Sequence, residues 1–144
     1  RVHRIPAERS DAHAAATEYG TTLRRLFGAR HPWPQFDLVL LGMGPDGHTA
    51  SLFPGTSALT ENTRWVAATW VSRLQTWRIT LTFPAINAAR QVLFAVTGAD
   101  KADRLAQVFG LSPGGNDLPA ARIRTNGGGV TWLIDRDASG GRIS

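Results

Sequence analysis

The chain has 144 residues, of which 42% are hydrophobic and 19% charged, so it is long enough for one globular domain and lacks the composition of a disordered protein. It contains no cysteine, which excludes disulfide bonds and thiolate metal ligands, and no apolar run reaches the length of a membrane span. The formal net charge of +5 favours a small anionic ligand. The arginines are dispersed along the chain, so we predict no nucleic-acid partner.

The amino terminus bears on the cellular location. Residues 1–10 are too polar for a secretory signal, so we expect a cytoplasmic protein with no membrane partner. The first residue is Arg1 rather than a methionine, and we therefore expect the chain to be part of a longer or processed product.

The first half of the chain predicts a long helix, a buried strand and a short helix. Alanine and leucine are frequent over Glu8–Phe27, which predicts a helix that ends at the following glycine. Phe36–Leu41 is an almost continuous apolar run, typical of a strand covered on both faces. A glycine-rich turn over Gly42–Gly47 follows. We expect His48–Phe53 to form a short helix, which the next proline ends.

The second half predicts strands that alternate with helices. The predicted strands are Arg64–Val71, Trp77–Phe83, Gln91–Thr97 and a last one through Trp132–Ile134. The predicted helices are Pro84–Arg90, Asp100–Phe109 and a short one from Leu118, with a Pro/Gly loop over Leu111–Asp117 and a turn at Gly127–Gly129. The alternation implies an α/β fold, a mainly parallel sheet flanked by helices, in a single domain over residues 1–144.

The glycine-rich turn has two interpretations. Gly42, Gly44 and Gly47 have the spacing G-x-G-x-x-G after a predicted strand, which is also the dinucleotide-binding fingerprint. However, Pro45 has no N–H to offer a pyrophosphate, and Asp46 places a carboxylate beside it. We therefore predict no nucleotide and no other cofactor.

His48 directly follows this turn, at the carboxyl end of a strand, where open parallel sheets place their ligand sites. Histidine titrates near neutral pH and can take a proton from water. Asp46 is close enough in sequence to orient the ring. From the residues alone, a catalytic histidine and an incidental exposed histidine in a capped loop remain equally open.

A longer segment decides between them by resemblance. Leu40–Gly55, with the sequence LLGMGPDGHTASLFPG, resembles the signature of the 6-phosphogluconolactonase family. Related glucosamine-6-phosphate deaminases share the core Gly-x-Gly-x-x-Gly-His but continue with a Phe-Asn-Glu-Pro-Gly type of sequence. Here Ala50–Gly55 stands in that place without an acidic residue. Further stretches resemble the same family in the same order: Arg78–Thr82, Ile86–Arg90, Val96–Ala102, Leu118–Ala120 and Val130–Asp135.

The resemblance implies a Rossmann-like α/β sandwich without nucleotide, of the kind shared with the sugar-phosphate isomerases and deaminases. It implies hydrolysis of 6-phospho-D-glucono-1,5-lactone to 6-phosphogluconate in the oxidative pentose phosphate pathway. His48 is then the general base that activates water, with Asp46 beside it. The amino-terminal portion of the family, with its phosphate loop, is not found in this sequence, so we expect the chain to be the C-terminal part of such a protein.

The phosphorylated sugar lactone needs an oxyanion site and fixed cations. We expect backbone N–H groups around Gly44 and Gly47 to act as oxyanion donors. We expect Lys101 to hold the phosphate, and Arg78 either to reach the same anion or to pair with an acidic residue on the surface. The complete set of predicted substrate-binding residues is Gly44, Gly47, Thr49, Arg78 and Lys101. Arg73 stands where the family often has a lysine followed by prolines, and its role is open.

Other readings of the chain stay open. One is a deaminase or isomerase of the same superfamily, and another is a catalytically incomplete fragment that binds sugar phosphates. His3, His13 and His31 have no shared ligand spacing, so we predict no metal. A sheet edge left uncovered favours a homo-oligomer.

Overall fold

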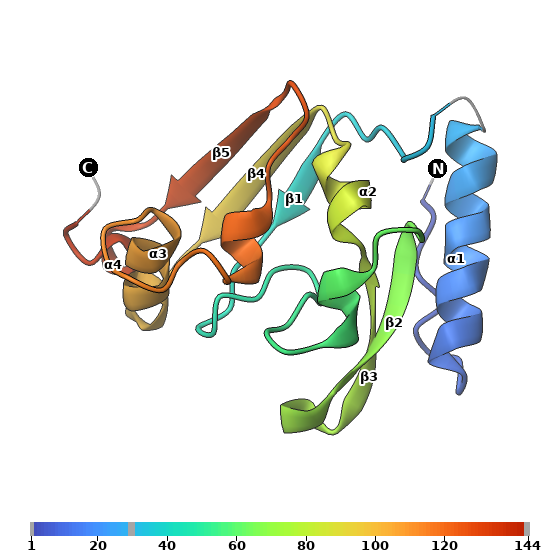
Figure 1. Cartoon of the computed structure of the whole chain (residues 1–144), viewed down its shortest axis with the longest axis horizontal. Helices are drawn as coiled ribbons and strands as arrows, with labels where there is room; N and C mark the ends of the chain where they lie inside the picture. Colours follow the sequence, from blue (N-terminus) through green and yellow to red (C-terminus); the bar gives the residue numbers. More distant parts are fainter. Residues whose placement is uncertain (1, 29–30, 143–144) are drawn as a thin grey trace.

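The computed structural model of the chain describes residues 2–28 and 31–142, and its centre is a three-stranded sheet (Figure 1). The strands are β1 (Val39–Leu41), β4 (Gln91–Val96) and β5 (Gly129–Ile134), in the order β1-β4-β5. Both pairings are parallel, with Val39 opposite Val92 and Val92 opposite Val130. This sheet and the helices beside it confirm the predicted α/β class.

The other two strands form a separate antiparallel hairpin. β2 (Val66–Val71) pairs with β3 (Thr76–Leu81), and neither joins the parallel sheet. The predicted parallel sheet is therefore formed by β1, β4 and β5, and this segment lies outside it. A parallel pair needs a crossover of a dozen or more residues, whereas Ser72–Leu74 and Gln75, with φ of 48°, reverse the chain within four residues.

The helices largely follow the sequence. They are α1 (Ala12–Phe27), α2 (Phe83–Asn87), α3 (Ala102–Val108) and α4 (Arg136–Ser139), with short 3₁₀ turns at Ser57–Thr60, Ser72–Leu74, Ala99–Lys101 and Pro119–Arg122. α1 begins four residues later than predicted, because the Asp11 carboxylate caps it by accepting from the N–H groups of His13 and Ala14. Within the described ranges, no helix combines the length and apolar character needed to cross a membrane.

The predicted helix over His48–Phe53 is wrong. The Leu52 N–H donates to the Thr49 carbonyl at 2.9 Å, and Thr49 and Leu52 form an isolated antiparallel bridge. Ala50 between them has φ of 51°, which a right-handed helix does not allow. The segment is a tight reversal of the chain, so no helix begins at His48.

The core has two connected parts. One lies against the parallel sheet and is centred on Val92, Phe94 and Leu105; the other lies between α1 and the hairpin and is centred on Leu23 and Trp65. Partly buried Phe36 and Leu81 pack against both. The prediction that β1 is covered on both faces is wrong for the described residues, because the side chain of Leu40 is 68% exposed. Leu133, on the same face of the sheet, is 56% exposed.

A carboxylate organises the loop before β2. Glu61 Oε1 accepts from the Thr63 N–H at 2.7 Å, from the Thr63 hydroxyl at 2.7 Å and from the Arg64 N–H at 3.0 Å. Burial raises the pKa of Glu61, but these hydrogen bonds and the charge of Arg64 lower it below the ordinary 4.5 overall. A carboxyl group with a lowered folded-state pKa stabilises the fold above its unfolded pKa, and that contribution is lost as the pH falls through the folded value.

We expect Glu61→Gln to lower the free energy of unfolding at pH 7 by about 1 kcal/mol, because charge-assisted hydrogen bonds become neutral ones. Below about pH 4 the difference from the parent chain should shrink, since the parent then loses its own carboxylate. Urea unfolding at pH 7 and pH 3 measures both values. Asp37→Asn, at a 90% exposed carboxylate paired only with Arg90, is the control and should change little; a pH-independent loss in Glu61→Gln would contradict the assignment.

Candidate functional site

The loop that follows β1 is folded on itself by its own backbone. The Gly44 N–H donates to the His48 carbonyl and the Gly47 N–H donates to the Gly44 carbonyl, both at 2.9 Å. Because both amides are used within the loop, they do not serve as the expected oxyanion donors in this conformation. The absence of a helix after the described loop also removes the feature that a dinucleotide site would need.

The two glycines are required by close approach. A Cβ on Gly44 would lie 2.1 Å from both Cε1 and Nδ1 of the His48 ring. Gly47 has φ of +81°, and a Cβ there would lie 2.9 Å from Cδ2 of Leu118. The histidine ring therefore rests directly on the backbone of Gly44, and the loop rests on Leu118.

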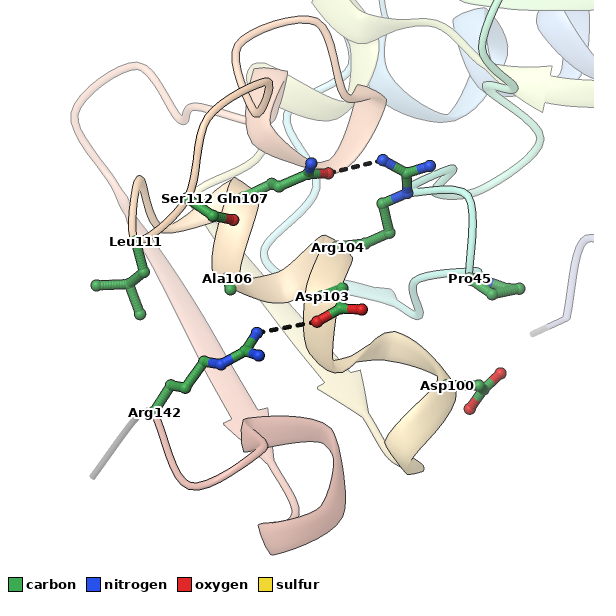
Figure 2. Close-up of a pocket in the computed structure, with 9 residues that line it drawn as sticks. All are labelled: Pro45, Asp100, Asp103, Arg104, Ala106, Gln107, Leu111, Ser112 and Arg142. Carbon is green, nitrogen blue, oxygen red and sulfur yellow. Dashed lines mark hydrogen bonds and ion pairs between the residues drawn. The ribbon is translucent and has the colours of Figure 1, made fainter.

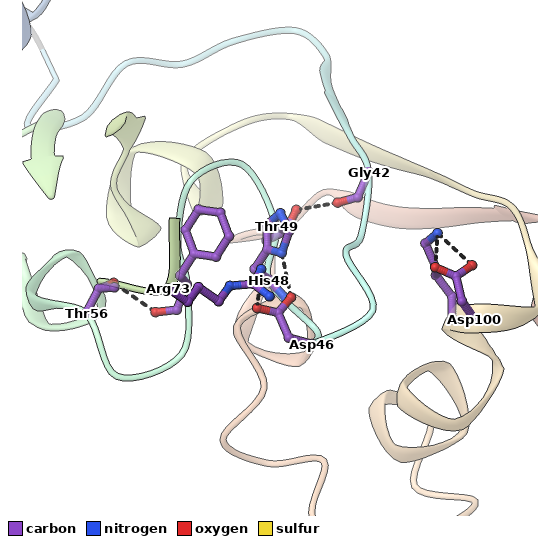
Figure 3. A network of polar contacts seen from close by, with 9 residues as sticks. Gly42, Asp46, His48, Thr49, Thr56, Arg73 and Asp100 are labelled. Carbon is purple, nitrogen blue, oxygen red and sulfur yellow. Dashed lines mark hydrogen bonds and ion pairs between the residues drawn. The ribbon is translucent and has the colours of Figure 1, made fainter. Parts of the chain in front are cut away.

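His48 and Asp46 form a hydrogen-bonded pair (Figure 3). His48 Nδ1 lies 2.5 Å from Asp46 Oδ1, and the same oxygen accepts from the His48 backbone N–H at 3.2 Å. An ionised carboxylate only accepts hydrogen bonds, so this contact favours the tautomer of the neutral imidazole in which Nδ1 carries the proton and Nε2 keeps its lone pair. The predicted proximity of these two residues is thus present, with the ring in the tautomer that a base needs.

Asp46 is also held by Arg73, a contact that the sequence did not reveal. Arg73 lies at the tip of the hairpin, and its Nη2 is 2.9 Å from Asp46 Oδ2. Burial raises the pKa of Asp46, but the hydrogen bonds and charge of His48, with the charge of Arg73, lower it below its ordinary value overall. The carboxylate is therefore ionised at neutral pH and can accept hydrogen bonds from both partners.

An aromatic ring packs against the histidine of this pair. Phe53 is 5% exposed, and its ring stacks on His48 with centroids 4.0 Å apart and an interplanar angle of 24°. The guanidinium carbon of Arg73 lies 5.2 Å from the same ring centroid. The tight reversal after His48 brings Phe53 to this position, so the stacking of the two rings depends on the observed turn and needs no helix.

His48 lines an open cleft of about 440 Å³ at the carboxyl ends of β1 and β4. Leu40, Leu41, the loop Gly42–Pro45, Ala50 and Lys101 form the remaining lining. Lys101 comes from the segment after β4 and is 22% exposed, with its ammonium 2.7 Å from Asp100 Oδ2. The structure therefore brings together the predicted base, Gly44 and the predicted phosphate ligand Lys101, at the end of the sheet where parallel folds place their ligands.

Three of the predicted substrate-binding residues do not line this cleft, and one of them, Gly47, uses its N–H within the loop. The Thr49 side chain is fully buried, and its hydroxyl donates to the Gly42 carbonyl at 2.8 Å, so it stabilises the loop. Arg78 is exposed on β3 and lines a different depression, with Trp70 and Trp77. Neither residue lines the cleft that contains His48.

A second cavity of about 650 Å³ shares Pro45 with this cleft (Figure 2). Its charges are balanced: Asp103 pairs with Arg142 at 3.0 Å, Asp100 pairs with Lys101, and Arg104 donates to the Gln107 side chain at 2.8 Å. It contains no histidine or other group placed to act as a base near neutral pH. Of these two cavities, the cleft with His48 is the one lined by an imidazole, the side chain suited to proton transfer near neutral pH.

Among the residues that the structure describes, no three His, Cys, Asp or Glu side chains cluster in a way that could hold a metal ion. The site instead combines a carboxylate, an oriented imidazole and a nearby ammonium group. Such a set can activate a water molecule beside an anionic ligand.

Comparison with known proteins gives a consistent result. Residues 1–132 match the family model described as glucosamine-6-phosphate isomerases/6-phosphogluconolactonase. The chain is 41% identical over 146 residues to a 6-phosphogluconolactonase of Nostoc sp., covering 99% of this chain and 58% of that protein. It is 39% identical to a probable chloroplastic 6-phosphogluconolactonase of Oryza sativa subsp. indica, covering 88% of this chain and 42% of that protein.

A solved structure of 6-phosphogluconolactonase from Trypanosoma brucei superposes with a TM-score of 0.81 at 32% identity, covering 95% of this chain and 56% of that one. The chain thus spans about half the length of the relatives that it matches.

Proposed function

This chain belongs to the family of glucosamine-6-phosphate isomerases and 6-phosphogluconolactonases, and from that premise we propose that it hydrolyses 6-phospho-D-glucono-1,5-lactone to 6-phosphogluconate. The observation that carries the proposal is the contact between Asp46 Oδ1 and His48 Nδ1, at a cleft that His48 shares with Lys101. The names of the relatives supply the substrate class, and this pair supplies the chemistry.

In the proposed reaction, His48 Nε2 takes a proton from water as the water oxygen attacks the lactone carbonyl carbon. Collapse of the tetrahedral intermediate breaks the bond between that carbon and the ring oxygen, and the imidazolium returns its proton to the ring oxygen. Asp46 holds the ring and stabilises the positive charge that it carries between these steps. A positioned base of this kind contributes on the order of 10²–10⁴ in rate.

The deaminase alternative has less support. Deaminases of this superfamily share the Gly-x-Gly-x-x-Gly-His core and continue with a Phe-Asn-Glu-Pro-Gly type of sequence, whereas here Ala50–Gly55 contains no carboxylate. The chain's nearest acidic group to the histidine is Asp46, which both His48 and Arg73 already engage. We therefore assign hydrolysis rather than deamination.

The test is hydrolysis of freshly generated lactone, coupled to phosphogluconate dehydrogenase, with the spontaneous rate subtracted. A parallel assay measures ammonia release from glucosamine 6-phosphate, and calorimetry measures binding of 6-phosphogluconate. A rate above the blank without ammonia release is the expected result. Ammonia release would assign deamination instead, and binding without turnover would assign a sugar-phosphate-binding chain.

Lys101 is the residue that we propose to anchor the phosphate. We expect Lys101→Met to raise KM for the phosphorylated lactone by about 10- to 100-fold, the equivalent of one charge-assisted contact, and to leave kcat within a few-fold. Unphosphorylated D-glucono-1,5-lactone, measured alongside, should show no such change. Arg25→Met, at an exposed cation on α1, is the matched control. Equal losses for both lactones would contradict the phosphate role of Lys101.

We further propose a cytoplasmic location, no nucleic-acid partner and a homo-oligomer. A sequence without cysteine suits the reducing cytoplasm, and the dispersed arginines support the second proposal. Leu40 and Leu133, exposed on one sheet face, support the third. Sedimentation velocity of the chain at micromolar concentration tests the oligomer, and a single monomer boundary would contradict it.

A further inference from the structure

We propose that Arg73 is a positioning residue that fixes Asp46, and through it the ring of His48, so that the tip of the β2–β3 hairpin is part of the catalytic machinery. The inference rests on the proposed function, since it assigns Arg73 a role in the same reaction. It adds a residue that lies 25 positions from His48 in the sequence, in a different structural unit of the described chain.

The first step of the argument is how the Asp46 carboxylate is shared. One oxygen, Oδ1, takes both contacts from His48, and the other, Oδ2, takes the contact from Arg73 at 2.9 Å (Figure 3). A carboxylate held only through Oδ1 can rotate about its Cβ–Cγ bond. Held through both oxygens, it presents one fixed acceptor to the imidazole Nδ1–H.

The second step is the shared aromatic support. His48 stacks on Phe53, and the Arg73 guanidinium lies over the same ring. Phe53 is buried, so this ring is a rigid reference for both side chains. Arg73 is therefore held by an ion pair and a cation–π contact together, although half of its side chain is exposed.

The third step is where Arg73 is anchored. It belongs to the turn Ser72–Leu74 of a hairpin that has no strand pairing with the parallel sheet. Towards the other end of the hairpin, β3 also contacts the segment after His48, where the Ser51 N–H donates to the Thr80 hydroxyl at 3.2 Å. The Arg73–Asp46 ion pair is thus the charged link between the hairpin tip and the loop.

The fourth step separates positioning from substrate binding. Arg73 is not among the residues that line the His48 cleft, whereas His48 and Lys101 are. An effect of Arg73 must therefore pass through its ion pair with Asp46 and its contact with Phe53, both of which touch His48. It should appear in kcat and in the state of the His48 ring, and leave KM unchanged.

The experiment compares Arg73→Gln, Arg73→Lys and the control Arg90→Gln, which removes another exposed arginine paired with one carboxylate. We expect Arg73→Gln to lower kcat about tenfold, because a loosened base misplaces its lone pair, with KM within twofold. Arg73→Lys should recover kcat to within about threefold, since the charge is kept without the planar fork. Nitrogen-15 chemical shifts of His48 should show the Nδ1–H tautomer in the parent chain and a mixture in Arg73→Gln.

The tautomer measurement needs no substrate, so it stands even if the chain hydrolyses no lactone. A tautomer in Arg73→Gln identical to that of the parent overturns the proposal whatever the kinetics show. A raised KM with kcat and tautomer unchanged also overturns it, and makes Arg73 a substrate ligand. Equal losses in Arg73→Gln and Arg90→Gln, with equal falls in melting temperature, would reduce the effect to general destabilisation.

Discussion

We expect His48→Ala to lower the lactone hydrolysis rate above the blank by about 10²- to 10⁴-fold, the contribution of a positioned general base. The reason is geometric: the ring is hydrogen-bonded through Nδ1 to Asp46, and its remaining nitrogen is the group in the cleft that can take a proton from water near neutral pH. KM should change little, because the phosphate anchor assigned to Lys101 is untouched. The measurement is the coupled hydrolysis assay over pH 5 to 8.

The control for this variant is His31→Ala, at an exposed histidine in the loop after α1 that does not line the cleft. It should keep the parent rate. Circular dichroism and thermal unfolding of both variants separate loss of the base from loss of the fold, because removal of the His48 ring also uncovers Phe53. His48→Ala with the parent rate, in a chain that hydrolyses the lactone, would remove His48 from the mechanism.

The sequence was sufficient to find the centre of this site. Phe36–Leu41 and Gln91–Thr97 were predicted as strands of a parallel sheet, and they pair in parallel as β1 and β4. His48 and Lys101 come after these two strands. Because ligands lie at the carboxyl ends of parallel strands, this order predicts that both residues line one cleft, as they do. Periodicity and topology were enough here because both residues follow their strands within a few positions.

Contacts made by tertiary packing were beyond the sequence. Nothing local in Ser72–Leu74 indicates that Arg73 reaches Asp46, because the ion pair depends on how the hairpin folds back onto the loop. Arg78, on the strand after that turn, was predicted to hold the phosphate, yet β3 directs it to a different depression. An arginine on a hairpin can face either side, and only the strand register decides which.

The helix predicted over His48–Phe53 failed for a similar reason. Local propensity in Thr49–Leu52 does not oppose a helix, but the Thr49 hydroxyl donates to the Gly42 carbonyl, and Ala50 adopts a positive φ. These tertiary contacts outweigh a helical preference of a few tenths of a kcal/mol per residue. The buried Thr49 hydroxyl, predicted to meet the substrate, is instead part of what folds the loop.

The same loop makes Gly44→Ala the most informative change besides His48 itself. We expect this variant to lose about 10²-fold in kcat while the chain stays folded. Its new Cβ would lie 2.1 Å from Cε1 and Nδ1 of His48 and 2.9 Å from Oδ1 of Asp46. The ring and the carboxylate must therefore both move away from residue 44, which disturbs their present contact. Gly44 does not have a positive φ, so the backbone itself accepts alanine. The measurements are kcat and the nitrogen-15 tautomer signature of His48.

Gly129→Ala is the matched control, because Gly129 also lacks a positive φ and a Cβ there meets nothing within 4 Å. It should keep the parent rate and the parent tautomer. A Gly44→Ala chain with the parent rate would show that the imidazole works from another position, and the Asp46 contact would then be incidental. If instead Gly44→Ala and Arg73→Gln disturb the same tautomer from opposite sides of Asp46, the ring is active because the loop backbone and the hairpin tip hold it together.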